Sequence, residues 1–128
     1  MYFYMKAWFK PVFSSASSKG VRVVSLNRRG YPGTTPYSPA ELKTLSEGDV
    51  EGLKACGVEL ALFLDGLIDN LSLPAPSIKE NEGGLAIMGW SLGNVIPLST
   101  VASVSALKPQ VQTQLQSYLR RLIVFGKL

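Results

Sequence analysis

The chain has 128 residues, a length that supports one domain with a buried core. Its net charge is +4, but basic residues are adjacent only at 28–29 and 120–121, so the clustered basic face of a nucleic-acid-binding protein is not expected. One cysteine, Cys56, and no histidine exclude an internal disulfide and the usual metal clusters, and we expect neither metal nor cofactor.

No stretch of about 18 apolar residues is present, so no membrane span is expected. The first residues lack a basic leader followed by a long apolar run, and we therefore expect no signal peptide and an intracellular location. Cys56 lies in a helical apolar pattern, which predicts a buried thiol.

The first third of the chain reads as helix, strand and loop. Residues 4–18 carry a broad apolar stripe, with Pro11 expected to kink or restart the helix and Gly20 to end it. The β-branched run 21–26 predicts a strand buried on both faces. Residues 27–39 are rich in glycine, proline and threonine and predict a loop.

A long amphipathic helix is predicted over about 47–71. Apolar or small residues recur there at steps of three and four, and Ser46 followed by Asp49 resembles a capping box. The apolar stripe suits packing against a sheet, and the alternative is a heptad surface for a partner helix.

The last third contains two further strands and two helices. An apolar run opens the stretch 85–97, a helical pattern follows over 92–106 with Pro97 expected to loosen its first turn, and another helix begins at 108–109. Residues 122–125 predict a final buried strand. This alternation predicts one α/β domain over 1–128, with three parallel strands, right-handed crossovers and helices on both faces.

The strand-to-helix junction at 89–93 fits the pattern G-x-S-x-G. A serine at such a junction is typical of a nucleophile elbow, in which Gly89 and Gly93 allow strand and helix to pass closely and Ser91 is exposed at the tip. One alternative is a turn whose serine only caps the helix. Another is phosphate binding, but the third glycine and the lysine of the nucleotide-binding motifs are missing.

A nucleophilic Ser91 requires three further groups. A base must take its proton, and in catalytic triads that base is a histidine oriented by a carboxylate. The tetrahedral intermediate also needs two hydrogen-bond donors, one of which is the backbone N–H of the following residue, here Leu92.

The chain resembles the α/β-hydrolase superfamily, of the ester-hydrolase type, from about residue 8 to residue 125. Two motifs carry the resemblance: a strand followed by the loop R-G-Y-P-G, within 21–35, and M-G-W-S-L-G-N at 88–94. The resemblance implies a partial α/β-hydrolase fold, a three-layer sandwich, in which Ser91 is the nucleophile. It also implies that the Leu92 N–H is an oxyanion donor and that Gly89 and Gly93 are the elbow glycines. Arg29 and Gly30 match a loop that is mainly structural.

Other parts of the family pattern are missing from this sequence. By resemblance, residues 8–18 correspond to the helix after the oxyanion loop, and the triad acid and histidine lie beyond residue 125, so the chain matches a central fragment. Lys79 and Lys108 stand at no recognised spacing from Ser91. We therefore expect the chain alone to be catalytically incomplete.

Three functions compete at this point. The first is a serine hydrolase that cleaves a carboxylic ester or related acyl bond of a small-molecule substrate through an acyl-Ser91 intermediate. The second is a non-catalytic α/β module that binds a partner or a small acyl ligand, and the third is a basic nucleotide-binding domain. A three-stranded sheet also leaves apolar edges, which predict self-association.

Overall fold

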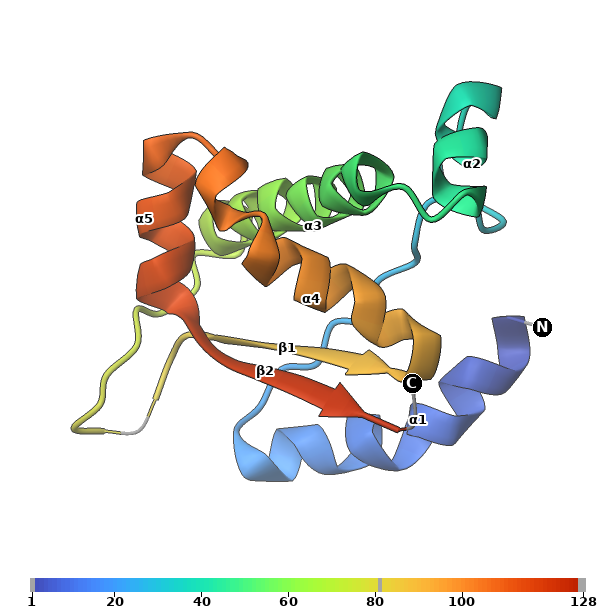
Figure 1. Ribbon diagram of the computed structural model, residues 1–128. Helices are drawn as coiled ribbons and strands as arrows, with labels where there is room; N and C mark the ends of the chain where they lie inside the picture. The colour runs from blue at the N-terminus through green and yellow to red at the C-terminus, as the bar shows by residue number, and fades with distance from the viewer. Residues whose placement is uncertain (1, 81, 127–128) are drawn as a thin grey trace. The chain divides into compact units, whose positions relative to one another are not determined.

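The chain divides into two compact units, Met1–Tyr37 and Ser38–Leu128. The computed structural model describes residues 2–80 and 82–126, and side chains from residue 9 onward (Figure 1). None of the helices in these ranges combines the length and apolar content needed to cross a bilayer.

The first unit begins with helix α1, Tyr2–Ala16, which contains Pro11 and continues into the 3₁₀ turn η1, Ser17–Lys19. Gly20 ends this segment in the left-handed conformation (φ 65°), as the sequence predicts. The strand predicted at 21–26 is wrong: these residues pair with no other strand in the described chain, and most of them are exposed. Their β-branched side chains favour extended backbone, but extended backbone becomes a strand only with a partner.

The loop after this extended segment is held by two arginine–tyrosine pairs. Arg28 donates to the Tyr31 hydroxyl over 2.8 Å and lies over its ring, and Arg29 donates to the Pro36 carbonyl over 3.1 Å while stacking on Tyr37. The loop is thus ordered by its own side chains.

The second unit opens with α2, Pro39–Ser46, an element that the sequence did not indicate. The capping box belongs to this helix, because Ser38 accepts from the Glu41 N–H and Glu41 accepts from the Ser38 N–H. The capping box expected at Ser46 is therefore wrong: Ser46 is the last residue of α2, and its hydroxyl donates to the Lys43 carbonyl.

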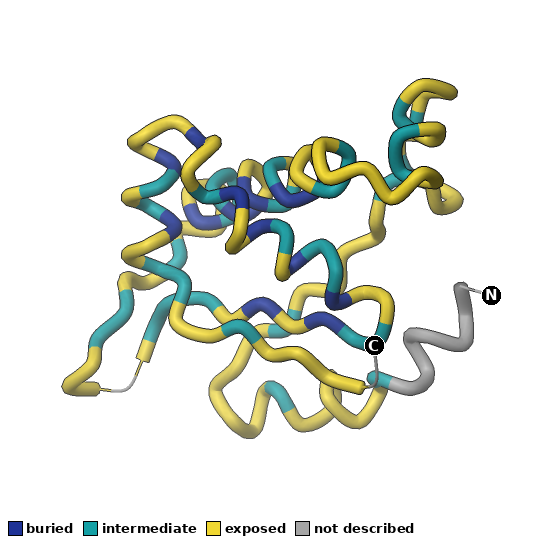
Figure 2. Tube along the Cα trace, viewed as in Figure 1, coloured by how far each residue is buried: buried dark blue, intermediate teal, exposed yellow. Residues whose placement is uncertain are grey.

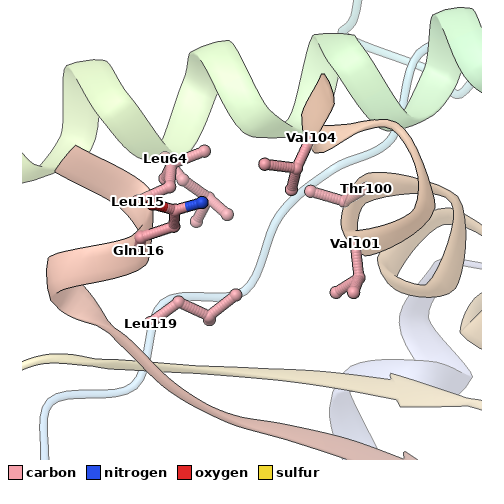
Figure 3. A pocket seen from close by; sticks show the side chains of 7 residues that line it. All are labelled: Leu64, Thr100, Val101, Val104, Leu115, Gln116 and Leu119. Carbon is pink, nitrogen blue, oxygen red and sulfur yellow. The ribbon is translucent and has the colours of Figure 1, made fainter. Parts of the chain in front are cut away.

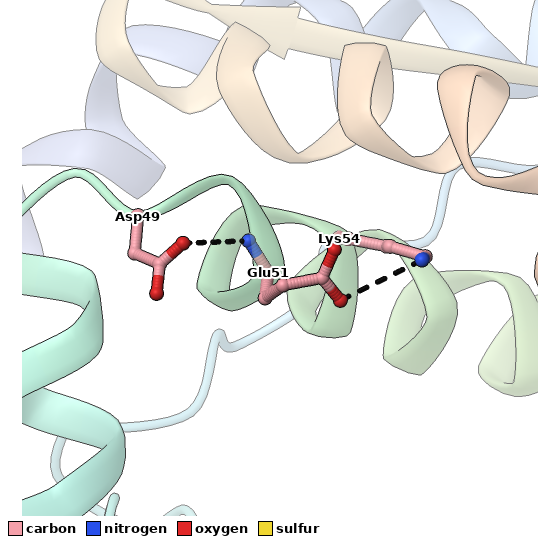
Figure 4. Close-up of polar contacts among 3 residues, drawn as sticks. All are labelled: Asp49, Glu51 and Lys54. Atoms are coloured by element: carbon pink, nitrogen blue, oxygen red, sulfur yellow. Dashed lines mark hydrogen bonds and ion pairs between the residues drawn. The ribbon is translucent and has the colours of Figure 1, made fainter.

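The predicted long helix is α3, Val50–Asn70. Asp49 caps it, accepting from the Glu51 N–H over 3.0 Å, and Glu51 forms an exposed ion pair with Lys54 over 3.5 Å (Figure 4). Such surface pairs contribute little to stability, so the helix depends on its apolar face. Cys56 is buried on that face, as predicted.

The sheet of the second unit is parallel and has two strands within the described residues, β1 (Leu85–Trp90) and β2 (Leu119–Phe125). Parallel pairing agrees with the sequence prediction, whereas the third strand is not there. The helices of this unit lie on one side of the sheet, with α4, Val95–Ala102, between α3 and the strands (Figure 1). The expected cover on both faces is thus not shown by this unit.

Two 3₁₀ turns interrupt the helical region that follows β1. The turn η2, Ser91–Asn94, precedes α4, and η3, Val104–Ala106, separates α4 from α5, Pro109–Tyr118. Pro97 lies in the first turn of α4. The residues just before α4 form a 3₁₀ turn instead of a regular α-helical turn, which agrees with the irregular helix start that Pro97 predicts.

The core is formed by residues of α3, α5 and β1, together with Leu107 just before α5 (Figure 2). Its fully buried apolar members are Ala61, Leu64, Ile68, Ile87, Leu107, Val111 and Leu115. Most of β2 is exposed by contrast, and it begins at Leu119, so the prediction of a buried final strand over 122–125 is right in its pairing but wrong in its burial. The core therefore fixes β1, and with it the strand end that carries Ser91.

Candidate active site

Ser91 lies at the sharp junction between β1 and η2 and has a left-handed backbone (φ 52°). Trp90 before it is still extended (φ −130°, ψ 127°), so the chain reverses direction within one residue. A left-handed conformation is unfavourable for a residue with a Cβ and persists only where its surroundings impose it. The junction thus has the strained geometry that a nucleophile elbow requires.

The two glycines of the motif differ in their surroundings. A Cβ at Gly89 would lie 2.6 Å from Asn94 Oδ1 and 2.7 Å from Asn94 Cα, so no side chain fits there unless η2 moves away. A Cβ at Gly93 would meet no atom of the described chain within 4 Å. The strand and η2 still pass closely at Gly93, whose carbonyl oxygen would lie 2.9 Å from a Cβ at Gly89, but the space beside Gly93 itself is open.

Leu92 presents its backbone N–H in the first turn of η2. Amide groups in a first helical turn have no acceptor within the helix and are available to a bound anion or oxyanion. Its side chain is 72% exposed and leaves the surface beside Ser91 apolar.

Asn94 is a feature of the site to which the sequence analysis assigned no role. It is fully buried (0% exposed), and its Nδ2 donates to the Phe125 carbonyl at the end of β2 over 3.1 Å. Its Oδ1 has no hydrogen-bond partner in the described chain. The signal in the sequence was an amide placed directly before the apolar run 95–98, where buried polar groups need a specific partner.

The end of β2 also touches the elbow through Gly126, which is left-handed (φ 90°). A Cβ at Gly126 would lie 2.9 Å from Trp90 Cδ1 and 3.4 Å from the Ser91 amide nitrogen. The backbone at 125–126 and the elbow are therefore in direct contact.

No base accompanies Ser91 among the residues that the structure describes. The sequence contains no histidine, and the Ser91 hydroxyl forms no hydrogen bond with any part of the chain that the structure describes. Lys79 lies in the loop before β1, at the amino end of the strands, and a six-residue strand of about 20 Å separates that end from Ser91. Lys108 precedes α5, whose last residue leads into the amino end of β2.

One hollow of about 300 Å³ opens between α4, α5 and β2 (Figure 3). Its walls are mostly aliphatic and include Leu64, Val101, Val104, Leu115 and Leu119, with Thr100 and Gln116 as polar members. Because Leu119 pairs with Leu85 at the amino end of the sheet, the hollow lies away from Ser91 and does not form an acyl pocket for it.

No group of three or more metal-binding side chains gathers anywhere in residues 2–80 and 82–126. No family model, curated protein or solved structure matches the chain. The strained serine between a parallel strand and a helix is therefore the feature on which a functional proposal depends.

Proposed function

We propose that Ser91 is the nucleophile of a serine hydrolase that cleaves carboxylic esters or related acyl bonds, on a partial fold of the α/β-hydrolase type. The left-handed backbone of Ser91, at a junction from parallel strand to helix, is the observation that carries this proposal. A serine that only capped the helix would accept a hydrogen bond from the first-turn amides through its side chain, and η2 has no side-chain cap.

The reaction has four requirements, and this chain meets two of them. Ser91 Oγ attacks the acyl carbonyl, and the Leu92 N–H donates to the oxyanion that forms. The proton of Ser91 needs a base, and the oxyanion needs a second donor. No described residue is assigned to either role, so the chain alone is expected to be inert toward fluorophosphonate probes.

The proposal is tested by supplying a base from solution. The chain is incubated with imidazole and a p-nitrophenyl ester, and acylated serines are located by peptide mass spectrometry. Ser91 is expected to acylate on the order of 10-fold faster than other serines, because it has one oxyanion donor and a diffusing base instead of a full triad.

Ser72 is the matched control for this experiment. It is also left-handed (φ 46°), and it is more exposed than Ser91, but it follows a helix instead of preceding one. Simple accessibility would thus favour Ser72. Equal or faster acylation of Ser72 would contradict the proposal, and in Ser91→Ala the imidazole-dependent product at this peptide should vanish.

A second candidate, a non-catalytic interaction module, is favoured by the apolar face of the sheet. Met88 pairs with Ile123 and Trp90 with Phe125 across the register, and Met88, Ile123 and Phe125 are 43%, 42% and 57% exposed. Exposed apolar pairs on a short sheet are typical of a surface that another polypeptide covers. Association without any Ser91-dependent acylation would favour this function.

A further inference from the structure

One side chain, that of Asn94, adds a hydrogen bond between the elbow and the carboxyl end of β2, beside the strand pairing of Trp90 with Phe125. Asn94 Nδ2 donates to the Phe125 carbonyl over 3.1 Å, across 31 positions of sequence. Asn94 is completely shielded from solvent, so its amide loses a partner that water does not replace when this bond is absent, although Phe125 on the acceptor side is exposed. Its carbon and oxygen atoms lie directly against Gly89, which has no Cβ to push them away.

Asn94 and Ser91 are the two ends of η2, so the position of one restricts the other. Gly126, the residue after the acceptor, lies against Trp90 and the Ser91 amide nitrogen. The elbow is therefore enclosed between the end of β1, where Gly89 admits Asn94, and the end of β2, where Gly126 admits Trp90. A left-handed serine persists only when contacts of this kind prevent its relaxation.

We propose that Asn94 is a positioning residue, which holds Ser91 in its left-handed conformation by tying the end of β2 to the elbow. The inference that this conformation serves catalysis rests on the proposed function, in which a strained serine presents its hydroxyl for attack. The tie itself is a structural claim that needs no chemistry at Ser91.

An amide suits this position because the acceptor is a carbonyl. A buried aspartate would not remove the bond at neutral pH, because burial raises the pKa of a carboxyl group and the protonated carboxyl donates as the amide does. Leucine has nearly the same shape and no hydrogen-bond donor at any pH. Asn94→Leu therefore removes the bond and keeps the volume of the side chain.

The experiment compares Asn94→Leu with Thr100→Val, its matched control. Thr100 is also a buried polar residue (2% exposed), but its hydroxyl donates to Ile96 within α4 and ties nothing to β2. Amide-to-Hα cross-relaxation within Ser91, measured by NMR, is strong for a positive φ. Imidazole-dependent acylation of Ser91 is the second readout.

In Asn94→Leu we expect Ser91 to lose its strong cross-relaxation and its acylation rate to fall about 100-fold, the effect of misplacing a reacting group by about 1 Å. Thr100→Val should retain both readouts. A folded Asn94→Leu in which Ser91 keeps its positive φ would overturn the proposal.

The unsubstituted chain supplies an independent measurement, should Asn94→Leu not fold. In increasing denaturant, the Asn94 side-chain amide protons should lose protection from exchange together with the Ser91 cross-relaxation. Loss of the amide protection while Ser91 remains left-handed would also overturn the proposal. If the original chain shows no Ser91 acylation, the proposed function fails, while the cross-relaxation results still decide whether Asn94 positions Ser91.

Discussion

At the scale of single residues, backbone strain at Ser91 is the property that separates a nucleophile elbow from an ordinary turn. Two non-glycine residues in the described chain have positive φ, Ser72 and Ser91. Ser72 lies just after α3, where left-handed residues commonly end helices. Ser91 lies between a strand and a helix, where a glycine would adopt the positive φ without the steric cost of a Cβ. The turn alone therefore does not explain why a serine stands there.

Replacing Ser91 by glycine should stabilise the protein. Glycine adopts positive φ without the steric cost of a Cβ, so Ser91→Gly is expected to raise the free energy of unfolding by about 0.5–1 kcal/mol. Ser91→Ala removes the same hydroxyl but keeps the Cβ and should give no gain. Urea unfolding of the three proteins checks this, and equal stability of the two variants would show that Ser91 is not strained.

Replacing the two motif glycines by alanine should change the stability of the protein by different amounts. Gly89→Ala places a Cβ against the Asn94 backbone and is expected to cost about 1–3 kcal/mol, the usual range for overpacking. Gly93→Ala faces open space and should change stability by less than about 0.5 kcal/mol. Denaturation midpoints measure both, and a costly Gly93→Ala beside a neutral Gly89→Ala would contradict the arrangement of η2 against β1.

At the scale of elements, the cap of α2 supplies a test of where the second unit's first helix begins. Ser38→Ala removes the capping-box acceptor for the Glu41 N–H and is expected to destabilise α2 by about 1 kcal/mol. Ser46→Ala removes a hydroxyl that donates to Lys43 at the other end and should have a smaller effect. Hydrogen exchange of the α2 amides distinguishes the two, because this exposed helix can open without global unfolding.

Helices α3 and α5 of the second unit were predictable because each buries one stripe at a 3.6-residue period. That period locates α3, and a proline at the first helical position locates the start of α5. The α2 helix was missed because it buries no residue and so has no apolar stripe to detect. The run 21–26 was misassigned because β-branched composition reports extended backbone and cannot report a pairing partner.

The candidate site was predictable in part. Local sequence indicates Ser91, because the elbow is a short-range turn between a strand and a helix. The role of Asn94 depends on Phe125, which is distant in sequence, and no local pattern reveals such a contact. For the same reason the motif predicts a close approach of strand and helix at Gly89, but it does not predict that the atoms of Asn94 lie there.

At the scale of the whole molecule, the sheet leaves an apolar face and two outer edges. Neither edge pairs with a further strand in the described chain, and exposed edges and apolar faces promote association. We expect sedimentation velocity to show self-association that increases with concentration. Ile123→Lys should weaken it, whereas Thr113→Lys, on the exposed side of α5, should not. A monomer at all concentrations would contradict the expectation.

The tie between Asn94 and Phe125 also has a consequence for the order of events during synthesis. Residue 91 is added to the chain 34 residues before residue 125. Until β2 has paired with β1, the hydrogen bond from Asn94 to Phe125 cannot form, and one of the contacts that oppose relaxation of Ser91 is missing. On the proposed function, the nucleophile is therefore completed only when the β2 segment, far along the chain, joins the sheet.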